Sequence, residues 1–240
     1  MTISTLHATS IFKRFGAVQV LDGIDFAMTS SEAIGIVGPN GAGKSTLMAV
    51  LSGALSPTSG RVTLDGAEVT GLNATARSAL GLVRTHQIPK PFAGLTVFEN
   101  VLVAATHAGG ARGAAAHAMT LQALDDAGMG PLANRPADSL GLLDRKRLEL
   151  ARALAAQPKL LLLDEIGGGL TDAEAVELVQ IIRSLLGKGI GVVWIEHIVH
   201  ILLQVTERLI CMDAGRIIAD GDPRTVMADP QVMRAYLGGV

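Results

Sequence analysis

The chain has 240 residues, with 20 Lys or Arg against 22 Asp or Glu, so its formal net charge is −2 when the histidines are neutral. This near-neutral charge without a basic block argues against a protein whose main task is to bind nucleic acid. The single cysteine, Cys211, excludes an internal disulfide framework. No apolar stretch approaches the roughly 18–20 residues that span a bilayer, and the first residues do not resemble a secretion signal. We therefore expect a soluble protein of the cytoplasmic type.

The first predicted elements combine alternating strands with one buried strand. Alternation over the first 35 residues and over residues 60–69 predicts exposed antiparallel strands. The apolar run Ala33–Val37 predicts a buried strand, followed at once by the glycine-rich segment Gly38–Gly43 and by a helical pattern over Lys44–Leu55. Because such apolar runs alternate with helical patterns along the chain, an α/β architecture with a mostly parallel sheet is expected.

Residues 87–157 differ from the rest of the chain because only helical patterns occur there. These patterns cover Thr96–His107, Ala115–Gly128 and Arg145–Gln157, with no convincing strand between them. We interpret residues 87–157 as a helical subdomain inserted into a core that consists of residues 1–86 and 158–240.

Two further buried strands are predicted after the helical subdomain, at Leu160–Leu163 and Ile190–Ile195. A helix between them begins at a capping box, because Thr171 is followed three residues later by Glu174. The apolar side of this helix is expected to consist of Val176, Val179, Ile182 and Leu186.

A phosphate-binding loop is the strongest functional motif. Residues 38–45 match the pattern G-x-x-x-x-G-K-[ST], which occurs by chance in a chain of this length with a probability on the order of 1%. Glycines allow backbone N–H groups to surround a polyphosphate, and the start of the next helix adds a positive dipole end. Lys44 is expected to neutralise the β- and γ-phosphate oxygens, and the Ser45 hydroxyl to bind Mg²⁺. The residues of the motif are Gly38, Pro39, Asn40, Gly41, Ala42, Gly43, Lys44 and Ser45.

A pair of acidic residues ends the apolar strand Leu160–Leu163. We expect this strand to lie beside the strand of the phosphate-binding loop, so that Asp164 supports Mg²⁺. The next residue, Glu165, could orient the attacking water or accept its proton.

Together these markers resemble ATP-binding-cassette (ABC) ATPases, and the resemblance covers essentially all 240 residues. It implies a P-loop NTPase (RecA-like) core with an N-terminal antiparallel β subdomain and the inserted helical subdomain. It also implies that ATP binds with Mg²⁺, its adenine stacked on Phe15 and its phosphates bound by the loop as far as Thr46. Glu165, Lys44, Gln87 and His197 would then contribute to hydrolysis, and Ser45, Gln87 and Asp164 to the Mg²⁺ site.

Finer features resemble the ATP-binding subunits of branched-chain amino acid importers. The segments that resemble this subfamily are Arg84–Gln87, Leu95–Asn100, Arg147–Arg152 and Asp229–Gly238. The resemblance implies a second cassette, transmembrane permease subunits, an indirect link to a solute-binding protein, and a position at the inner face of the cell membrane. A groove near the apolar stretch Ile88–Val103 would receive a short helix of the permease. Urea uptake and lipopolysaccharide export are the alternatives among close relatives.

The signature loop departs from the family pattern. Leu140-Gly141-Leu142-Leu143-Asp144 stands where the family has Leu-Ser-Gly-Gly-Gln, a loop that closes over ATP bound to the opposite cassette. Loss of a hydrogen-bond donor at such a site costs about 10²–10³ in rate. We therefore predict that this chain works beside a different cassette with an intact signature, giving one fast and one slow site. The alternative is a regulatory subunit that binds ATP but scarcely hydrolyses it.

Overall fold

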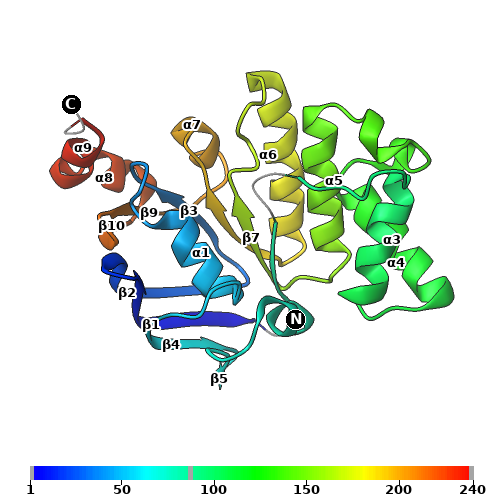
Figure 1. The fold of residues 1–240 in the computed structure, drawn as a ribbon. Helices are drawn as coiled ribbons and strands as arrows, with labels where there is room; N and C mark the ends of the chain where they lie inside the picture. The colour runs from blue at the N-terminus through cyan, green and yellow to red at the C-terminus, as the bar shows by residue number, and fades with distance from the viewer. Residues whose placement is uncertain (1–2, 86–88, 238–240) are drawn as a thin grey trace.

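Two β-sheets and a group of helices make up the structure, a computed structural model in which residues 3–85 and 89–237 are described. Figure 1 shows helix α1 between the two sheets, with the helical part at the opposite side of the larger sheet. The smaller sheet is antiparallel, with the strand order β2-β1-β4-β5. Its strands are β1 (Thr5–Phe15), β2 (Val18–Thr29), β4 (Ser59–Leu64) and β5 (Ala67–Glu68). The antiparallel strands expected near the N-terminus and over residues 60–69 are thus confirmed.

The larger sheet has six strands in the order β10-β9-β3-β8-β7-β6. All of its pairings are parallel except that of β9 with β10, which form a hairpin. Its strands are β3 (Ala33–Val37), β6 (Leu82–Arg84), β7 (Leu160–Asp164), β8 (Gly191–Ile195), β9 (Arg208–Asp213) and β10 (Arg216–Gly221). The buried strands β3, β7 and β8 are confirmed, and all fifteen of their residues are buried.

One expectation about strand order is wrong. The acidic strand β7 does not lie beside β3, because β8 pairs with both of them. The helix after β7 returns the chain to a new position between the two strands, and apolar composition alone does not specify that order. The carboxyl ends of β3 and β7 nevertheless point to the same edge of the sheet, since the strands are parallel.

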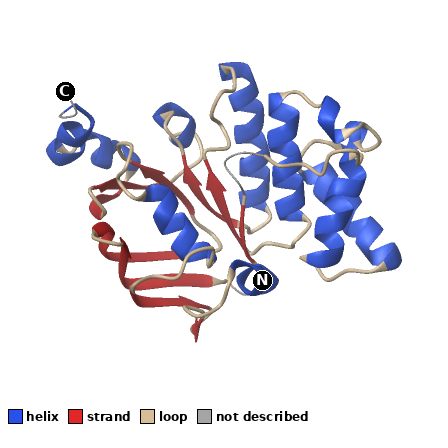
Figure 2. Cartoon of the chain, viewed as in Figure 1, coloured by secondary structure: helices blue, strands red, loops and turns tan. Residues whose placement is uncertain are grey.

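Helix α1 (Lys44–Ser52) joins the two sheets. Seven of its nine residues are buried, and Leu47, Met48 and Leu51 belong to one core with side chains of both sheets. Figure 2 shows this helix with strands of the larger sheet on one side of it and strands of the smaller sheet on the other. The loop that precedes α1 is therefore anchored at both of its ends.

The part of the chain from residue 89 to 157 is helical in the structure. It contains α3 (Val97–His107), α4 (Gly113–Asp126) and α5 (Leu142–Leu154), which pack against one another. Among the described residues of this part, one isolated antiparallel bridge joins Thr96 to Pro136. Helix α5 begins three residues before the predicted start, at Leu142.

Helix α6 (Asp172–Gly187) begins at the predicted capping box. The Thr171 hydroxyl accepts a hydrogen bond from the Glu174 N–H at 3.3 Å, and the Glu174 carboxylate accepts one from the Thr171 N–H at 2.8 Å. The expected apolar face is partly wrong, since Val176 is 47% exposed. The buried side is Ala175, Leu178, Val179, Ile182 and Leu185. Val179 and Ile182 are therefore confirmed and Leu186 is half-buried, because the face follows the core that the helix shares with β7 and β8.

The remaining helices are short. They are α2 (Ala74–Ala79), α7 (Val199–Leu202), α8 (Pro223–Ala228) and α9 (Pro230–Leu237). Figure 1 places α8 and α9 at the end of the chain beside β9 and β10. No helix in the described ranges is both long and apolar enough to cross a bilayer.

Candidate nucleotide site

The phosphate-binding loop connects the end of β3 to the start of α1, and two of its glycines are required by the backbone. Gly38 has φ +143°, and a Cβ atom there would lie 2.1 Å from the Met212 carbonyl oxygen. Gly43, the residue before α1, has φ +100°, and its Cβ would lie 2.8 Å from the Val20 carbonyl oxygen. Only glycine fits such positions without displacing the neighbouring main chain.

The loop and the acidic strand end face one cavity. This cavity has a volume of about 200 Å³ and is open at the surface. It is lined by Val20, Asn40, Gly41, Ala42, Gly43, Lys44, Ser45, Thr46 and Glu165. Because the N-terminus of α1 has no side-chain cap, its first N–H groups are available to an anion in this cavity.

Lys44 is buried and bonded to the loop itself. Its ammonium group donates hydrogen bonds to the carbonyl oxygens of Gly38 at 2.7 Å and Pro39 at 3.0 Å. Burial lowers the pKa of Lys44, and the nearby carboxylates of Glu165 and Asp164 oppose that shift. A cation with this environment gains stabilisation from an added phosphate.

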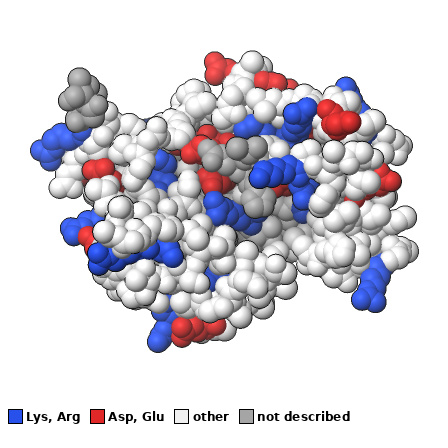
Figure 3. Space-filling view, in the orientation of Figure 1, with Lys and Arg blue, Asp and Glu red and all other residues white. Residues whose placement is uncertain are grey.

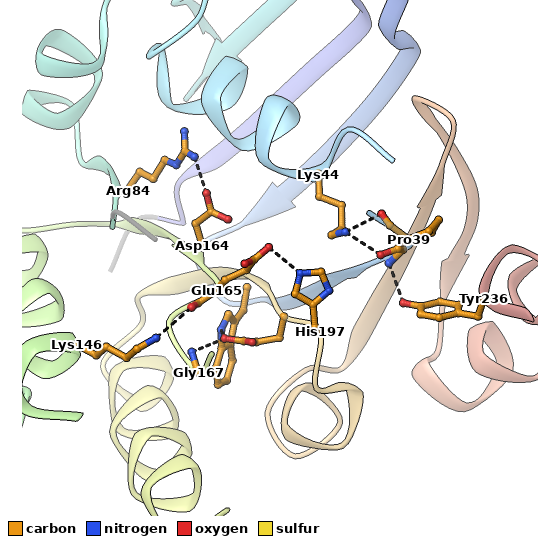
Figure 4. A network of polar contacts seen from close by, with 12 residues as sticks. Pro39, Lys44, Arg84, Lys146, Asp164, Glu165, Gly167, His197 and Tyr236 are labelled. Atoms are coloured by element: carbon orange, nitrogen blue, oxygen red, sulfur yellow. Dashed lines mark hydrogen bonds and ion pairs between the residues drawn. The ribbon is translucent and has the colours of Figure 1, made fainter. Parts of the chain in front are cut away.

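Glu165 lies directly after β7, where it meets His197. The His197 Nε2 atom and the Glu165 Oε1 atom form a hydrogen bond of 2.9 Å, shown in Figure 4. Glu165 has φ +50°, in the left-handed region. This backbone conformation costs about 1–3 kcal/mol for a residue other than glycine, and such strain is concentrated at functional sites.

Asp164 is buried at the end of β7 and is only half satisfied. Its Oδ2 atom accepts a hydrogen bond from the Arg84 guanidinium at 2.6 Å. Its Oδ1 atom is also buried, and no hydrogen-bond partner for it occurs among the described residues. A buried carboxylate oxygen without a partner is costly, so this atom fits a cation or a water bound to one. Together with the Ser45 hydroxyl it offers the oxygen ligands that Mg²⁺ prefers.

The altered signature loop lies at the start of α5. Gly141 is the residue before the helix, and an added Cβ there would meet nothing within 4 Å. Leu142 is 47% exposed, and Asp144 forms an ion pair with Arg147 at 3.7 Å. Arg147 is also bonded, more closely, to Glu177 on α6, so it is shared between two carboxylates.

Several of the described residues predicted from the sequence do not line the cavity, namely Phe15, Gly38, Pro39, Asp164 and His197. Gly38 and Pro39 bond to Lys44 and His197 bonds to Glu165, so these three contact residues that do. Phe15 ends β1 with 47% of its surface exposed, and the Lys13 ammonium lies 5.0 Å from the centre of its ring. It does not line the cavity, although Val20 on the paired strand does. Gln87 lies outside the described residues, so its role stays a prediction.

The sequence analysis missed several residues that the structure places at the site. Arg84 is one, and its position at the end of a short apolar run, like that of Asp164, was the available signal. Another is Tyr236 on α9, whose hydroxyl accepts a hydrogen bond from the Gly38 N–H at 2.8 Å. No local pattern indicates a contact between residues so far apart in the chain. Figure 3 shows acidic and basic side chains gathered together near the middle of this face of the molecule.

Comparison with known proteins agrees with this geometry. The sequence model of the ABC transporter family matches residues 21–167, and that of the branched-chain amino acid ATP-binding cassette transporter matches residues 216–240. The chain belongs to the ABC transporter family and is an ATP-binding subunit of the kind that hydrolyses ATP.

Individual relatives cover nearly the whole chain. The high-affinity branched-chain amino acid transport ATP-binding proteins BraF of Pseudomonas aeruginosa and LivG of Escherichia coli are each 32% identical to it over 99% of both chains. The lipopolysaccharide export system ATP-binding protein LptB of Haemophilus influenzae is 32% identical over 98% of both chains. A crystal structure of an ATP-binding cassette in its ADP conformation superposes with a TM-score of 0.88 at 30% identity, covering 99% of this chain and all of that one.

Proposed function

We propose that this chain binds MgATP at the phosphate-binding loop and hydrolyses it to drive import of branched-chain amino acids or similar small solutes through separate membrane subunits. The observation that supports hydrolysis best is that one cavity is lined by both the loop and Glu165. The relatives BraF and LivG support the choice of solute. LptB supports lipopolysaccharide export as the second candidate at equal identity. The chain would act in the cytoplasm, at the inner face of the cell membrane.

The mechanism follows from the contacts of three side chains. Lys44 leaves the carbonyl oxygens of Gly38 and Pro39 and neutralises charge on the β- and γ-phosphates. The Glu165 carboxylate orients a water molecule for in-line attack on the γ-phosphorus, and His197, already bonded to Glu165, keeps that carboxylate oriented and stabilises the transferred group. Hydrolysis breaks the bond between the γ-phosphorus and the β–γ bridging oxygen and yields ADP and phosphate.

Mg²⁺ fits the residues present. The Ser45 hydroxyl and the unsatisfied Oδ1 atom of Asp164 would hold the ion, directly or through water, with Gln87 as a predicted further ligand. When bound, Mg²⁺ neutralises charge that develops on the phosphate oxygens. The side chain of Arg84 holds the other carboxylate oxygen of Asp164 and so fixes its orientation.

We further propose that the second cassette is a different chain. Related cassettes have been crystallised as dimers. If this chain pairs with a second cassette in the same way, its loop 140–144 would face the partner's nucleotide. Gly141 supplies no hydroxyl group, and Leu142 and Leu143 add bulk. The site that uses this chain's phosphate-binding loop would then be fast only with a partner that has an intact signature.

A second, larger cavity is a candidate docking surface for the permease. It has a volume of about 410 Å³ and a mostly apolar lining from α1, α2, β6 and the end of α3. It is lined by Ser52, Ala54, Ala74, Thr75, Ser78, Ala79, Leu82, Val83, Arg84, His107 and Ala108. This differs from the expected groove over Ile88–Val103, where Phe92 is covered on one face by Arg152. Because Arg84 lines this cavity and also binds Asp164, it connects the docking surface to the Mg²⁺ site.

Two measurements test the proposal. Calorimetry of the purified chain with MgATP should show binding, and phosphate release should rise when the cognate second cassette is added. Absence of binding by folded protein would refute the nucleotide site, and full activity of the chain alone would refute the requirement for a different partner.

For the docking surface, a cysteine at the exposed position 79 (Ala79→Cys) should cross-link to the co-expressed permease, whereas the native Cys211 is fully buried and gives little background.

A further inference from the structure

Two charged side chains are buried next to the catalytic segment without lining its cavity. Lys146 on α5 is 4% exposed, and Glu196, directly after β8, is 1% exposed. Charged groups of these types are almost never so buried unless they are paired. Each favours the charged form of the other, although burial still raises the pKa of Glu196 and lowers that of Lys146.

Glu196 holds the backbone that follows Glu165. Its Oε1 atom accepts hydrogen bonds from the Gly167 N–H and from the Trp194 indole N–H, the latter at 3.0 Å. A Cβ atom at Gly167 would lie only 2.8 Å from this oxygen. Glycine at position 167 therefore leaves room for this close approach of main chain to carboxylate.

Lys146 holds the backbone of Glu165 itself. Its ammonium group donates to the Glu165 carbonyl oxygen at 3.4 Å, while the Glu165 N–H donates to the Ile195 carbonyl oxygen at 2.9 Å. Figure 4 shows Lys146 reaching the main chain of Glu165 while His197 meets its carboxylate. Both contacts are made to the backbone of a residue in the left-handed region, a conformation that persists only where surrounding structure holds it.

We propose that Lys146 and Glu196 are positioning residues that hold the segment from Glu165 to Gly167 in its hydrolytic geometry. Lys146 also lies on the first turns of α5, two residues after the loop 140–144. A movement of that loop on the partner's nucleotide would reach this chain's own Glu165 through Lys146. This inference rests on the proposed ATPase function and adds a route by which one site of the cassette pair senses the other.

If Lys146 and Glu196 only pack the core, their loss has different kinetic consequences than if they position Glu165. Loss of a packing pair lowers stability, whereas loss of a positioning pair lowers the turnover number and leaves the affinity for MgATP unchanged. A displacement of a catalytic group by about 1 Å can cost about 10²-fold in rate. The positioning effect must also vanish when Glu165 itself is disabled, because residues that act through one group are not additive.

The test uses the full-length chain with its cognate second cassette, and MgATP as the probe. Lys146→Met should lower kcat about 10- to 100-fold with the dissociation constant of MgATP changed less than about two-fold. Lys146→Arg should restore most of the activity, because it keeps a cation that donates to the same oxygen. In a Glu165→Gln background, Lys146→Met should cause no further loss. Lys159→Met, at an exposed lysine outside the site, is the matched control with unchanged kcat.

Glu196→Gln provides a second variant with an optical readout. Trp194 is the only tryptophan and its indole donates to Glu196, so its emission should change on MgATP binding in the wild type and change less in Glu196→Gln. An unaltered kcat in both Lys146→Met and Glu196→Gln would overturn the inference, as would an additive loss in the Glu165→Gln background. If the wild type neither binds nor hydrolyses MgATP, the proposed function fails instead.

Discussion

Single atoms decide what the phosphate-binding loop can do. The Met212 carbonyl oxygen leaves no room for a side chain at Gly38, and the Gly38 carbonyl oxygen accepts a hydrogen bond from the Lys44 ammonium group. The carboxylate of Glu165 faces the same cavity from another element. Binding and chemistry are therefore assigned to different residues, and substitutions should separate the two.

The first prediction concerns Glu165→Gln. This change removes the charge that orients water but leaves the loop intact, so kcat should fall about 10²- to 10⁴-fold while MgATP still binds. Phosphate release and calorimetry on the same preparation measure both quantities. Glu207→Gln, at an exposed position away from the cavity, should alter neither. Turnover at the wild-type rate would remove Glu165 from the catalytic role.

The second prediction concerns the only thiol. Cys211 is fully buried on β9, and burial raises its pKa to about 11. At pH 8 about 0.1% of such a thiol is ionised, and even that fraction is enclosed. Native protein should therefore react with an aromatic disulfide reagent far more slowly than protein unfolded in guanidinium chloride, which should release one equivalent. Rapid reaction of the native form would show that β9 opens readily.

Helix boundaries show how a few local bonds define an element. Thr171 and Glu174 bond reciprocally at the start of α6, and Thr96 and Glu99 do the same at the start of α3. Each box satisfies N–H groups that the helix leaves without partners. These bonds are exposed to solvent, so each contributes modestly to the free energy of unfolding.

The third prediction concerns Thr171→Ala. Loss of this cap should lower the free energy of unfolding by about 1 kcal/mol, which corresponds to a fall of roughly 2–4 °C in Tm for a chain of this size. Differential scanning calorimetry provides the measurement. Thr106→Ala is the control, because the Thr106 hydroxyl bonds to the Leu102 carbonyl oxygen inside α3 and caps nothing. An equal loss in both variants would contradict a specific capping effect.

The sequence predicts elements well where the signal is local. The capping box of α6, the buried strand β3 and the glycine loop all depend on residues within one short segment. The insertion of β8 between β3 and β7 was not predictable in the same way, because strand order is fixed by packing across the whole sheet. Arg84, Lys146 and Tyr236 were missed for a related reason, since each acts on a residue that is distant in the sequence.

At the scale of the whole molecule, the cavity of the phosphate-binding loop and the altered signature lie in different parts of the chain. The cavity around the phosphate-binding loop contains Glu165, whereas the loop 140–144 lacks the serine hydroxyl and adjacent glycines of the family pattern. In the proposed cassette pair, each chain supplies the first feature to its own nucleotide and the second to its partner's. Under this proposal, activity is a property of the pair.

The fourth prediction restores the family signature in this chain. The substitutions Gly141→Ser, Leu142→Gly, Leu143→Gly and Asp144→Gln together should raise the phosphate release of the chain alone about 10- to 100-fold. The structure has space for the serine side chain. Leu121→Gly, at an exposed leucine of α4, controls for simple loosening of a helix and should have no such effect. No gain in the restored chain would contradict the assignment of a slow site.

The position of β3 has a consequence for how the protein is made. This strand pairs on both sides with strands from the last quarter of the chain, and the loop after it is contacted by a tyrosine near the C-terminus. A ribosome therefore exposes this very apolar strand long before its neighbours exist. We expect the nascent chain to gain nucleotide affinity only after β8, β9 and Tyr236 have been synthesised, and to need protection from aggregation until then.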